Sequence, residues 1–161
     1  MTFRTTRLAV ALTIVGGLLL SVQATRADAP QGHFSMGSGA NAGTVYDTKT
    51  HLTWQQTSPA AIFTWSDAKK TCATLGLAGG GWRLPTLVEL LSLVDFQAPP
   101  NASLDPTAFP ADEGGWTYWT ASATPAGAST SGTLKAWYLQ GPLPLSVDPL
   151  SSYPYAIRCV R

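Results

Sequence analysis

The stretch GWRLPTLVELLSLVD, residues 81–95, decides the fold because it joins a helix start to an apolar face in a chain that is only 12% charged. Thr86 and Glu89 form a capping box directly after Pro85. Apolar residues then recur at i, i+3, i+4 and i+7, which places them on one helix face: Leu87, Leu90, Leu91 and Val94. The pattern predicts a short helix from Thr86 to about Asp95 and gives Glu89 a structural role at the helix start.

A first helix is predicted just upstream, in TWSDAKKTCATLG, residues 64–76. Thr64 can cap it, Asp67 gives a weaker version of the capping box, and Gly76 can end it in a left-handed turn. Its apolar residues fall at i, i+3, i+7 and i+10, which predicts a buried face that carries a cysteine inward: Trp65, Ala68, Cys72 and Leu75.

The chain has two cysteines, Cys72 and Cys159. For an exported chain we predict one disulfide between them rather than two buried free thiols. It closes a loop of about ninety residues, for which the chain-entropy account assigns about 4 to 5 kcal/mol. The two histidines, His33 and His51, provide no zinc-ligand spacing, so we expect no metal and no cofactor.

The amino terminus predicts export. Two arginines precede an uncharged apolar run, residues 8–20, which is followed by small residues. The run is shorter than the roughly 20 residues of a membrane-spanning helix, so residues 1–27 are interpreted as a cleaved signal peptide. Cleavage is expected after Ala24 or Ala27, giving a secreted, periplasmic or cell-surface protein without an integral membrane segment.

Removing residues 1–27 takes away three arginines and leaves seven basic against nine acidic side chains, a formal charge of −2. There is no basic stripe, so nucleic acid is not an expected partner. Residues 28–43 are rich in Gly, Ala and Ser and are interpreted as a flexible lead-in, whereas residues 44–161 form one domain.

The remainder predicts short strands and long loops. Residues 44–56 suit a hairpin with a turn at Asp47–Thr50. Two stretches rich in Pro and Gly, residues 96–115 and 141–154, are expected to be irregular. Strands are predicted in the β-rich runs WTYWTAS (116–122), LKAWYLQ (134–140) and YAIRCVR (155–161).

These segments, in this order, resemble the C-terminal domain of the Legionella collagen-like adhesin family over about residues 43–161. The specific core of the likeness is Trp65 and Ala68 before Cys72, then WRLP (82–85) with Glu89, then Arg158 and Cys159. The resemblance implies an α+β, C-type-lectin-like fold: two short helices packed on small twisted antiparallel sheets, with long loops that carry the ligand site and one disulfide.

The chain also departs from related proteins. The calcium-dependent lectins of this fold have Glu-Pro-Asn or Gln-Pro-Asp and Trp-Asn-Asp triplets, none of which occurs here. Collagen repeats are absent too. The resemblance extends to proteins that bind sulfated polysaccharides, but a charge of −2 does little to attract a polyanion.

Four residues are candidate ligand contacts: Trp116, Tyr118, Lys135 and Tyr138. They lie in or beside the expected loops, residues 97–119 and 124–135, and exposed aromatic faces there suit a sugar ring or a partner protein. Tyr118 and Trp119 are adjacent, so we expect at most one of them to join the core through its strand. Trp65, Trp82, Arg83 and Arg158 are assigned to the scaffold, with the Arg83 guanidinium held beneath the sheet by Glu89 or a backbone carbonyl.

The sequence therefore predicts an exported adhesion or ligand-binding module for a glycan or a cell-surface or envelope protein. The alternative is an exported redox enzyme of the wider formylglycine-generating-like fold that uses Cys72 and Cys159. The buried helical face around Cys72 favours a static bridge instead. The sequence has no nucleophile triad, zinc signature or phosphate-binding loop, so catalysis is not expected.

Overall fold

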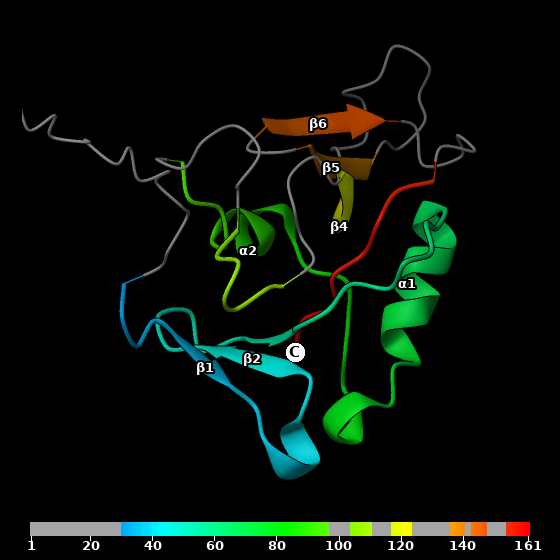
Figure 1. The fold of residues 1–161 in the computed structure, drawn as a ribbon. Coiled ribbons are helices and arrows are strands. Elements are labelled where there is room, and N and C mark those ends of the chain that lie inside the picture. Colours follow the sequence, from blue (N-terminus) through cyan, green and yellow to red (C-terminus); the bar gives the residue numbers. More distant parts are fainter. Residues whose placement is uncertain (1–29, 97–103, 111–116, 124–135, 141–142, 148–153) are drawn as a thin grey trace, which may run out of the picture.

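A computed structural model describes residues 30–96, 104–110, 117–123, 136–140, 154–161 and, for the backbone alone, 143–147. It shows a small α+β domain with two antiparallel sheets of three strands each, ordered β1-β2-β3 and β4-β5-β6 (Figure 1). The helices are α1 (Trp65–Ala73) and α2 (Leu87–Leu91), with two 3-10 turns, η1 (Gly39–Asn41) and η2 (Leu77–Gly79). The strands are β1 (Phe34–Met36), β2 (Thr44–Asp47), β3 (Thr53–Gln55), β4 (Thr117–Ala123), β5 (Ala136–Gln140) and β6 (Leu143–Val147).

The predicted hairpin is present as β2 and β3, and the buried Asp47 carboxylate builds its turn. Its oxygens accept hydrogen bonds from the Lys49 and Thr50 amides at 2.8 and 3.3 Å and from the Thr50 hydroxyl at 2.7 Å. Burial raises the pKa of Asp47, but the hydrogen bonds from Thr50 and Lys49 outweigh it and hold the pKa below its ordinary value. The carboxylate therefore stabilises the turn, and the same hydrogen bonds favour its ionised form.

The expected flexible lead-in is corrected by the structure. Phe34–Met36 is a strand, β1, that pairs antiparallel with β2. His33 Nε2 lies 3.0 Å from Asp47 Oδ1, so the segment before β1 is also tied to the hairpin turn. The sequence prediction missed this strand because Gly and Ser surround three β-compatible residues.

Helix α1 begins at the predicted cap. The predicted capping box at its start and the predicted left-handed turn at its end are not formed. The Thr64 hydroxyl accepts from the Asp67 amide at 3.3 Å and donates to the Asp67 carboxylate at 2.8 Å, so no reciprocal capping box forms. The helix ends at Ala73, and Gly76 has a φ of −81°, not the predicted left-handed conformation. Ala68 and Cys72 are fully buried, which confirms the inward face.

Helix α2 has the predicted capping box, with both of its bonds formed between Thr86 and Glu89. It ends at Leu91, earlier than expected, because the chain tightens into 3-10-type bonds: the Leu93 amide donates to the Leu90 carbonyl at 3.2 Å. Leu93 and Val94 lie beyond the end of α2 and are nevertheless buried. The apolar pattern therefore predicted their burial correctly, whereas it predicted a helix that is too long.

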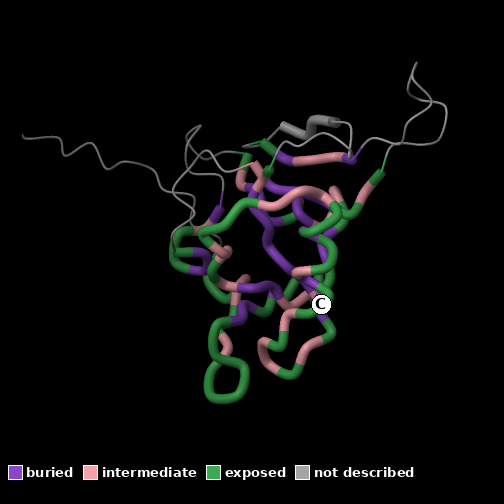
Figure 2. The backbone as a smooth tube through the Cα atoms, turned by 90° about the vertical axis from the view of Figure 1, so that its right-hand side faces the viewer, coloured by how far each residue is buried: buried purple, intermediate pink, exposed green. Residues whose placement is uncertain are grey.

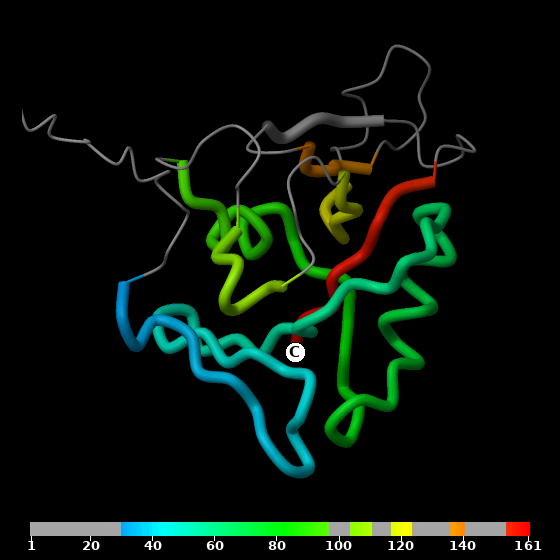
Figure 3. Tube along the Cα trace, in the orientation of Figure 1, coloured from blue at the N-terminus to red at the C-terminus, as the bar shows by residue number. Residues whose placement is uncertain are grey.

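The sequence predicted a strand at residues 155–161. In the structure, the carboxy-terminal segment, residues 154–161, is instead a connector between the two sheets. Thr53 and Arg161 exchange two backbone hydrogen bonds of 2.9 Å at the edge of β3. Earlier in the segment, the Ala156 carbonyl accepts a hydrogen bond of 3.0 Å from the Trp119 amide at the edge of β4. Figure 3 shows this segment in red, passing beside α1 and ending near β2. Because its partners change every few residues, it forms isolated bridges instead of a ladder.

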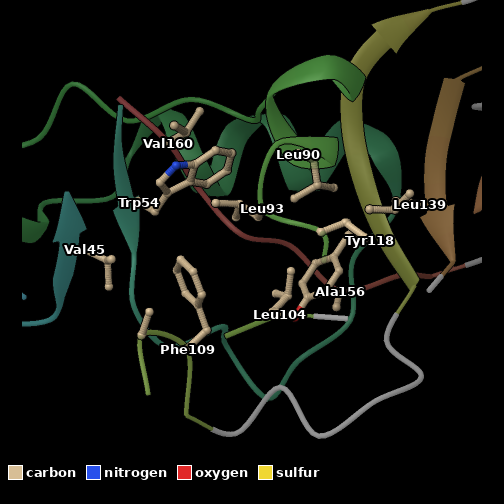
Figure 4. Packing of buried hydrophobic residues seen from close by; sticks show 12 residues of the cluster. Val45, Trp54, Leu90, Leu93, Leu104, Phe109, Tyr118, Leu139, Ala156 and Val160 are labelled. Carbon is tan, nitrogen blue, oxygen red and sulfur yellow. The ribbon is translucent and has the colours of Figure 1, made fainter. Parts of the chain in front are cut away.

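At Tyr118 and Trp119, strand β4 is buried on both of its faces, which corrects the expectation for these adjacent aromatic residues. Tyr118 is 5% exposed and Trp119 is 0% exposed, in two separate core clusters. The buried residues lie along the centre of the molecule in Figure 2. In Figure 4, Tyr118 faces Leu90 and Leu104 within the first cluster.

Two regions expected to be irregular contribute to the structure. Leu104 and Phe109, from the long connection 96–115, are buried in the first core cluster, and Figure 4 shows the Phe109 ring beside Trp54. The Pro-rich connection 141–154 contains β6, which pairs with β5. Pro144 is tolerated there because β6 lies at the edge of its sheet.

Within the part of the chain that the structure describes, none of the helices has the length and apolar character required to cross a membrane.

Candidate functional site

The motif WRLP is held on both sides by the scaffold. The Trp82 indole donates to the Leu77 carbonyl at 2.6 Å. The backbone groups of Arg83 and Val160 exchange two bonds of 2.9 Å, and the Pro85 carbonyl accepts from the Ala121 amide at 2.6 Å. These bonds connect the motif to the carboxy-terminal segment and to β4, as a fold-defining role requires.

The Arg83 side chain does not lie beneath the sheet as predicted. It reaches the surface, where its side chain is 48% exposed and that of Glu89 is 22% exposed. Its two terminal nitrogens donate to the two Glu89 carboxylate oxygens at 2.8 and 2.6 Å, a bidentate pair. This hydrogen bonding lowers the pKa of Glu89 to about 2 and raises the pKa of Arg83. The predicted partner is confirmed, whereas the predicted location is wrong.

An open groove of about 430 Å³ lies beside this ion pair, between α1, α2 and β4. Ala73, Leu84 and Ala121 give it apolar surface. Its polar groups are Lys69, Arg83, Thr86 and Glu89. The groove thus combines an apolar surface with several hydrogen-bonding groups, which is the usual make-up of a small-ligand site.

Lys69 is positioned by the first helix. Its ammonium lies 4.1 Å from the centroid of the Trp65 ring, one helical turn earlier. The Trp65 indole donates to the Thr120 carbonyl at 2.8 Å, which fixes the ring against β4. A fixed ring therefore supports the lysine that lines the groove.

The groove carries a small positive charge, although the chain without residues 1–27 is negative overall. Two cations, Lys69 and Arg83, face one carboxylate, Glu89, among the described residues of the lining. Because Glu89 compensates Arg83 directly, Lys69 provides the excess charge. Together these side chains offer both donors and an acceptor to a ligand.

The sequence-predicted contacts do not come together in the described structure. Trp116 and Lys135 lie outside the described residues. Tyr118 is a correction: its ring is in the core, its hydroxyl lies 3.2 Å from the Ser58 hydroxyl, and burial raises its pKa to about 12. Tyr138 is half-buried and packs edge-on against Trp119, with ring centroids 6.2 Å apart. Neither tyrosine lines the groove.

Sequence reasoning missed Lys69 and Thr86 as groove residues. A signal for Lys69 was available, because Trp65 and Lys69 are four residues apart and such residues are neighbours on a helix surface. For Thr86 the capping pattern pointed only to a structural role. Its place beside the groove follows from the packing of α2 against β4, where the Leu87 amide donates to the Ser122 hydroxyl at 2.9 Å.

The predicted disulfide is confirmed: Cys72 and Cys159 are bonded, with their Cα atoms 5.5 Å apart and a sequence separation of 87. It connects the buried face of α1 to the carboxy-terminal segment. Among the described residues, no three His, Cys, Asp or Glu side chains gather in a way that suits a metal ion.

The molecule is thus a disulfide-bridged α+β domain whose WRLP motif lies between the two helices in the chain and is bonded to β4 and to the carboxy-terminal segment. The family model described as Lcl C-terminal domain matches residues 43–161. The chain belongs to this family. No curated protein and no solved structure matches it.

Proposed function

We propose that the protein is an exported binding module of C-type-lectin-like fold that recognises a glycan. The groove between α1, α2 and β4 carries this proposal, because it presents donors, an acceptor and an apolar surface together. Family membership and the arrangement of two helices, small antiparallel sheets and one disulfide support the fold assignment. Residues 1–27 support export as a signal peptide, to the periplasm, the cell surface or the medium.

The chemistry of the groove suits a sugar. A sugar ring has apolar C–H faces and edges lined with hydroxyl groups, and each hydroxyl both donates and accepts. Arg83 and Lys69 donate only, whereas the Glu89 carboxylate accepts only. A hydroxyl pair placed at the Arg83–Glu89 pair meets one donor and one acceptor. The apolar surface at Ala73 and Leu84 is left for a ring face.

A redox function has less support. Cys72 is 0% exposed and Cys159 is 1% exposed, and both are engaged in the disulfide. Thiol–disulfide exchange requires a thiolate to reach one of the sulfurs. Burial on the inner face of α1 favours a permanent structural bond.

A glycan array probed with the purified, oxidised protein tests the proposal, without calcium and at low and high salt. Lys69→Ala should weaken binding by about tenfold, since it removes one charged donor from the groove. Lys70→Ala is the matched control, because Lys70 lies on the same helix, pairs with Asp67 at 3.9 Å and does not line the groove.

Equal binding by the two lysine variants would place the glycan site elsewhere. Absence of binding to every glycan would contradict the proposed function. Circular dichroism of each variant ensures that a binding loss is not a folding loss.

A further inference from the structure

Strand β4 is hydrogen-bonded to both helices that flank the groove, but in two different ways. The Ser122 hydroxyl accepts a bond of 2.9 Å from the Leu87 amide, which belongs to the backbone of α2. The Thr120 carbonyl accepts a bond of 2.8 Å from the Trp65 indole, which is a side chain of α1. On the α1 side of the groove, the described hydrogen bond to β4 therefore depends on one tryptophan.

Lys69 depends on the same tryptophan for its position at the groove. Its ammonium is carried by a flexible four-carbon stem, and the residue is exposed. None of the described carboxylates pairs with Lys69, whereas its neighbour Lys70 pairs with Asp67 at 3.9 Å. The Lys69 ammonium instead lies 4.1 Å from the centroid of the Trp65 ring, one helical turn earlier on the same face.

A ring that is itself fixed can hold the ammonium in one place. The Trp65 ring is half-buried and packs against the second core cluster, in addition to its bond to Thr120. Ordering a long side chain on binding costs conformational entropy. A lysine that is already ordered in the free protein loses less of that entropy and binds more tightly.

We propose that Trp65 is a positioning residue of the groove, whose hydrogen-bonded ring holds the Lys69 ammonium where a glycan meets it. Trp65 then has a role beyond the scaffold to which the sequence assigned it. The effect on binding rests on the proposed glycan function, whereas the position of Lys69 can be measured without any glycan.

NMR of the free protein tests the position of Lys69. Protons above the face of an aromatic ring resonate upfield, so the ε-methylene protons of Lys69 should lie upfield of those of Lys70. In Trp65→Leu the Lys69 signals should move to the region of the Lys70 signals, and the Lys70 signals should stay where they are. Coincident signals of the two lysines in the original protein would overturn the proposal, whether or not a glycan binds.

The glycan array measures the effect on binding. Trp65→Leu should weaken binding by about threefold, less than Lys69→Ala does, because the lysine is still present but is no longer held. Trp65→Phe keeps an aromatic face without the indole N–H and should bind better than Trp65→Leu. Equal binding by these two variants would contradict a role for the ring. Thermal unfolding ensures that both variants are folded at the temperature of the array.

A double-mutant cycle distinguishes positioning from a purely structural role. If Trp65 acts through Lys69, Trp65→Leu should cause no further loss of binding in the Lys69→Ala protein. A purely structural role would weaken binding again by the same factor in that protein, and this result would overturn the proposal. An original protein that binds no glycan but shows the upfield Lys69 signals would contradict the glycan function and confirm the position of Lys69.

Discussion

Arg83 and Arg158 have similar sequence surroundings and opposite structural environments. Both belong to the motif residues on which the family likeness depends. Each is also the direct neighbour in the chain of a residue with a structural role. Arg83 is half-exposed and forms a bidentate pair with Glu89. Arg158 is 1% exposed and donates to the carbonyls of Gln55 and Gln56, the latter at 2.7 Å.

The two environments also act differently on the charge. Hydrogen bonding to Glu89 raises the pKa of Arg83, whereas burial lowers the pKa of Arg158 to about 9. Arg158 therefore stays charged at neutral pH. Its guanidinium carbon lies 4.5 Å from the centroid of the Phe109 ring, so aromatic and carbonyl groups surround a buried cation. The comparison shows that one arginine organises the core and the other belongs to a surface groove.

The largest expected effect comes from the disulfide, which holds the segment that carries Arg158. Replacing Cys72 and Cys159 together by alanine should lower the free energy of unfolding by about 4 to 5 kcal/mol, because the unfolded chain is no longer constrained by a loop of this length. Urea unfolding measures it. A loss below about 1 kcal/mol would mean that the segment is held by its backbone bonds alone.

Arg158→Met should come next, with a loss of about 3 kcal/mol, because the buried Gln55 carbonyl and the partly buried Gln56 carbonyl lose their donor. Arg83→Met should cost only about 1 kcal/mol, since its ion pair is partly exposed to solvent. Thermal and urea unfolding of both variants compare the sites directly. Equal losses would contradict the distinction between core and surface.

Local patterns predicted the helices, the hairpin and the disulfide, because these depend on neighbours along the chain or on two unique residues. The capping box at Thr86 is a clear example. The location of Arg83 could not be predicted in this way, because the Arg-Leu alternation is equally compatible with either face. It depends on how residues 154–161 bridge the two sheets.

The site was predicted less well than the fold for a related reason. Tyr118 was selected because it follows a long loop, but Leu104 and Phe109 of that loop fold back and close the core around it. Lys69 was passed over because it is an ordinary lysine on a helix. Its role depends on α1 and α2 lying on either side of one groove, a long-range arrangement that no local spacing shows.

Acid should affect the Arg83 site specifically. The pKa of Glu89 is about 2 in the folded protein because Arg83 donates to it, against an ordinary value of 4.5. A lowered folded-state pKa means that the stabilisation is complete above pH 4.5 and is lost as the pH falls toward 2. Allowing for solvent at the pair, we expect about 1 to 2 kcal/mol to be lost across this range.

Glu89→Gln is the control for this acid dependence. It should be less stable at neutral pH and should lose less on acidification than the original protein does. Unfolding free energies near neutral pH and in mild acid, within the range where Glu89 titrates, measure the difference between the two proteins. Parallel pH profiles would assign the acid sensitivity to other carboxylates, such as Asp47.

Thr86→Ala should have an effect as small as that of Arg83→Met, about 1 kcal/mol, because the Glu89 amide loses its acceptor, now 3.2 Å away at the Thr86 hydroxyl. Thr86→Ser keeps that acceptor and should retain most of the stability. The Glu89 carboxylate still accepts from the Thr86 amide at 2.8 Å, so the effect reaches Arg83 only through a looser helix start.

A double-mutant cycle of Thr86→Ala with Arg83→Met should therefore show coupling, and one with Arg158→Met should be additive. Coupling to Arg158 instead would show that the surface site and the core respond as one unit.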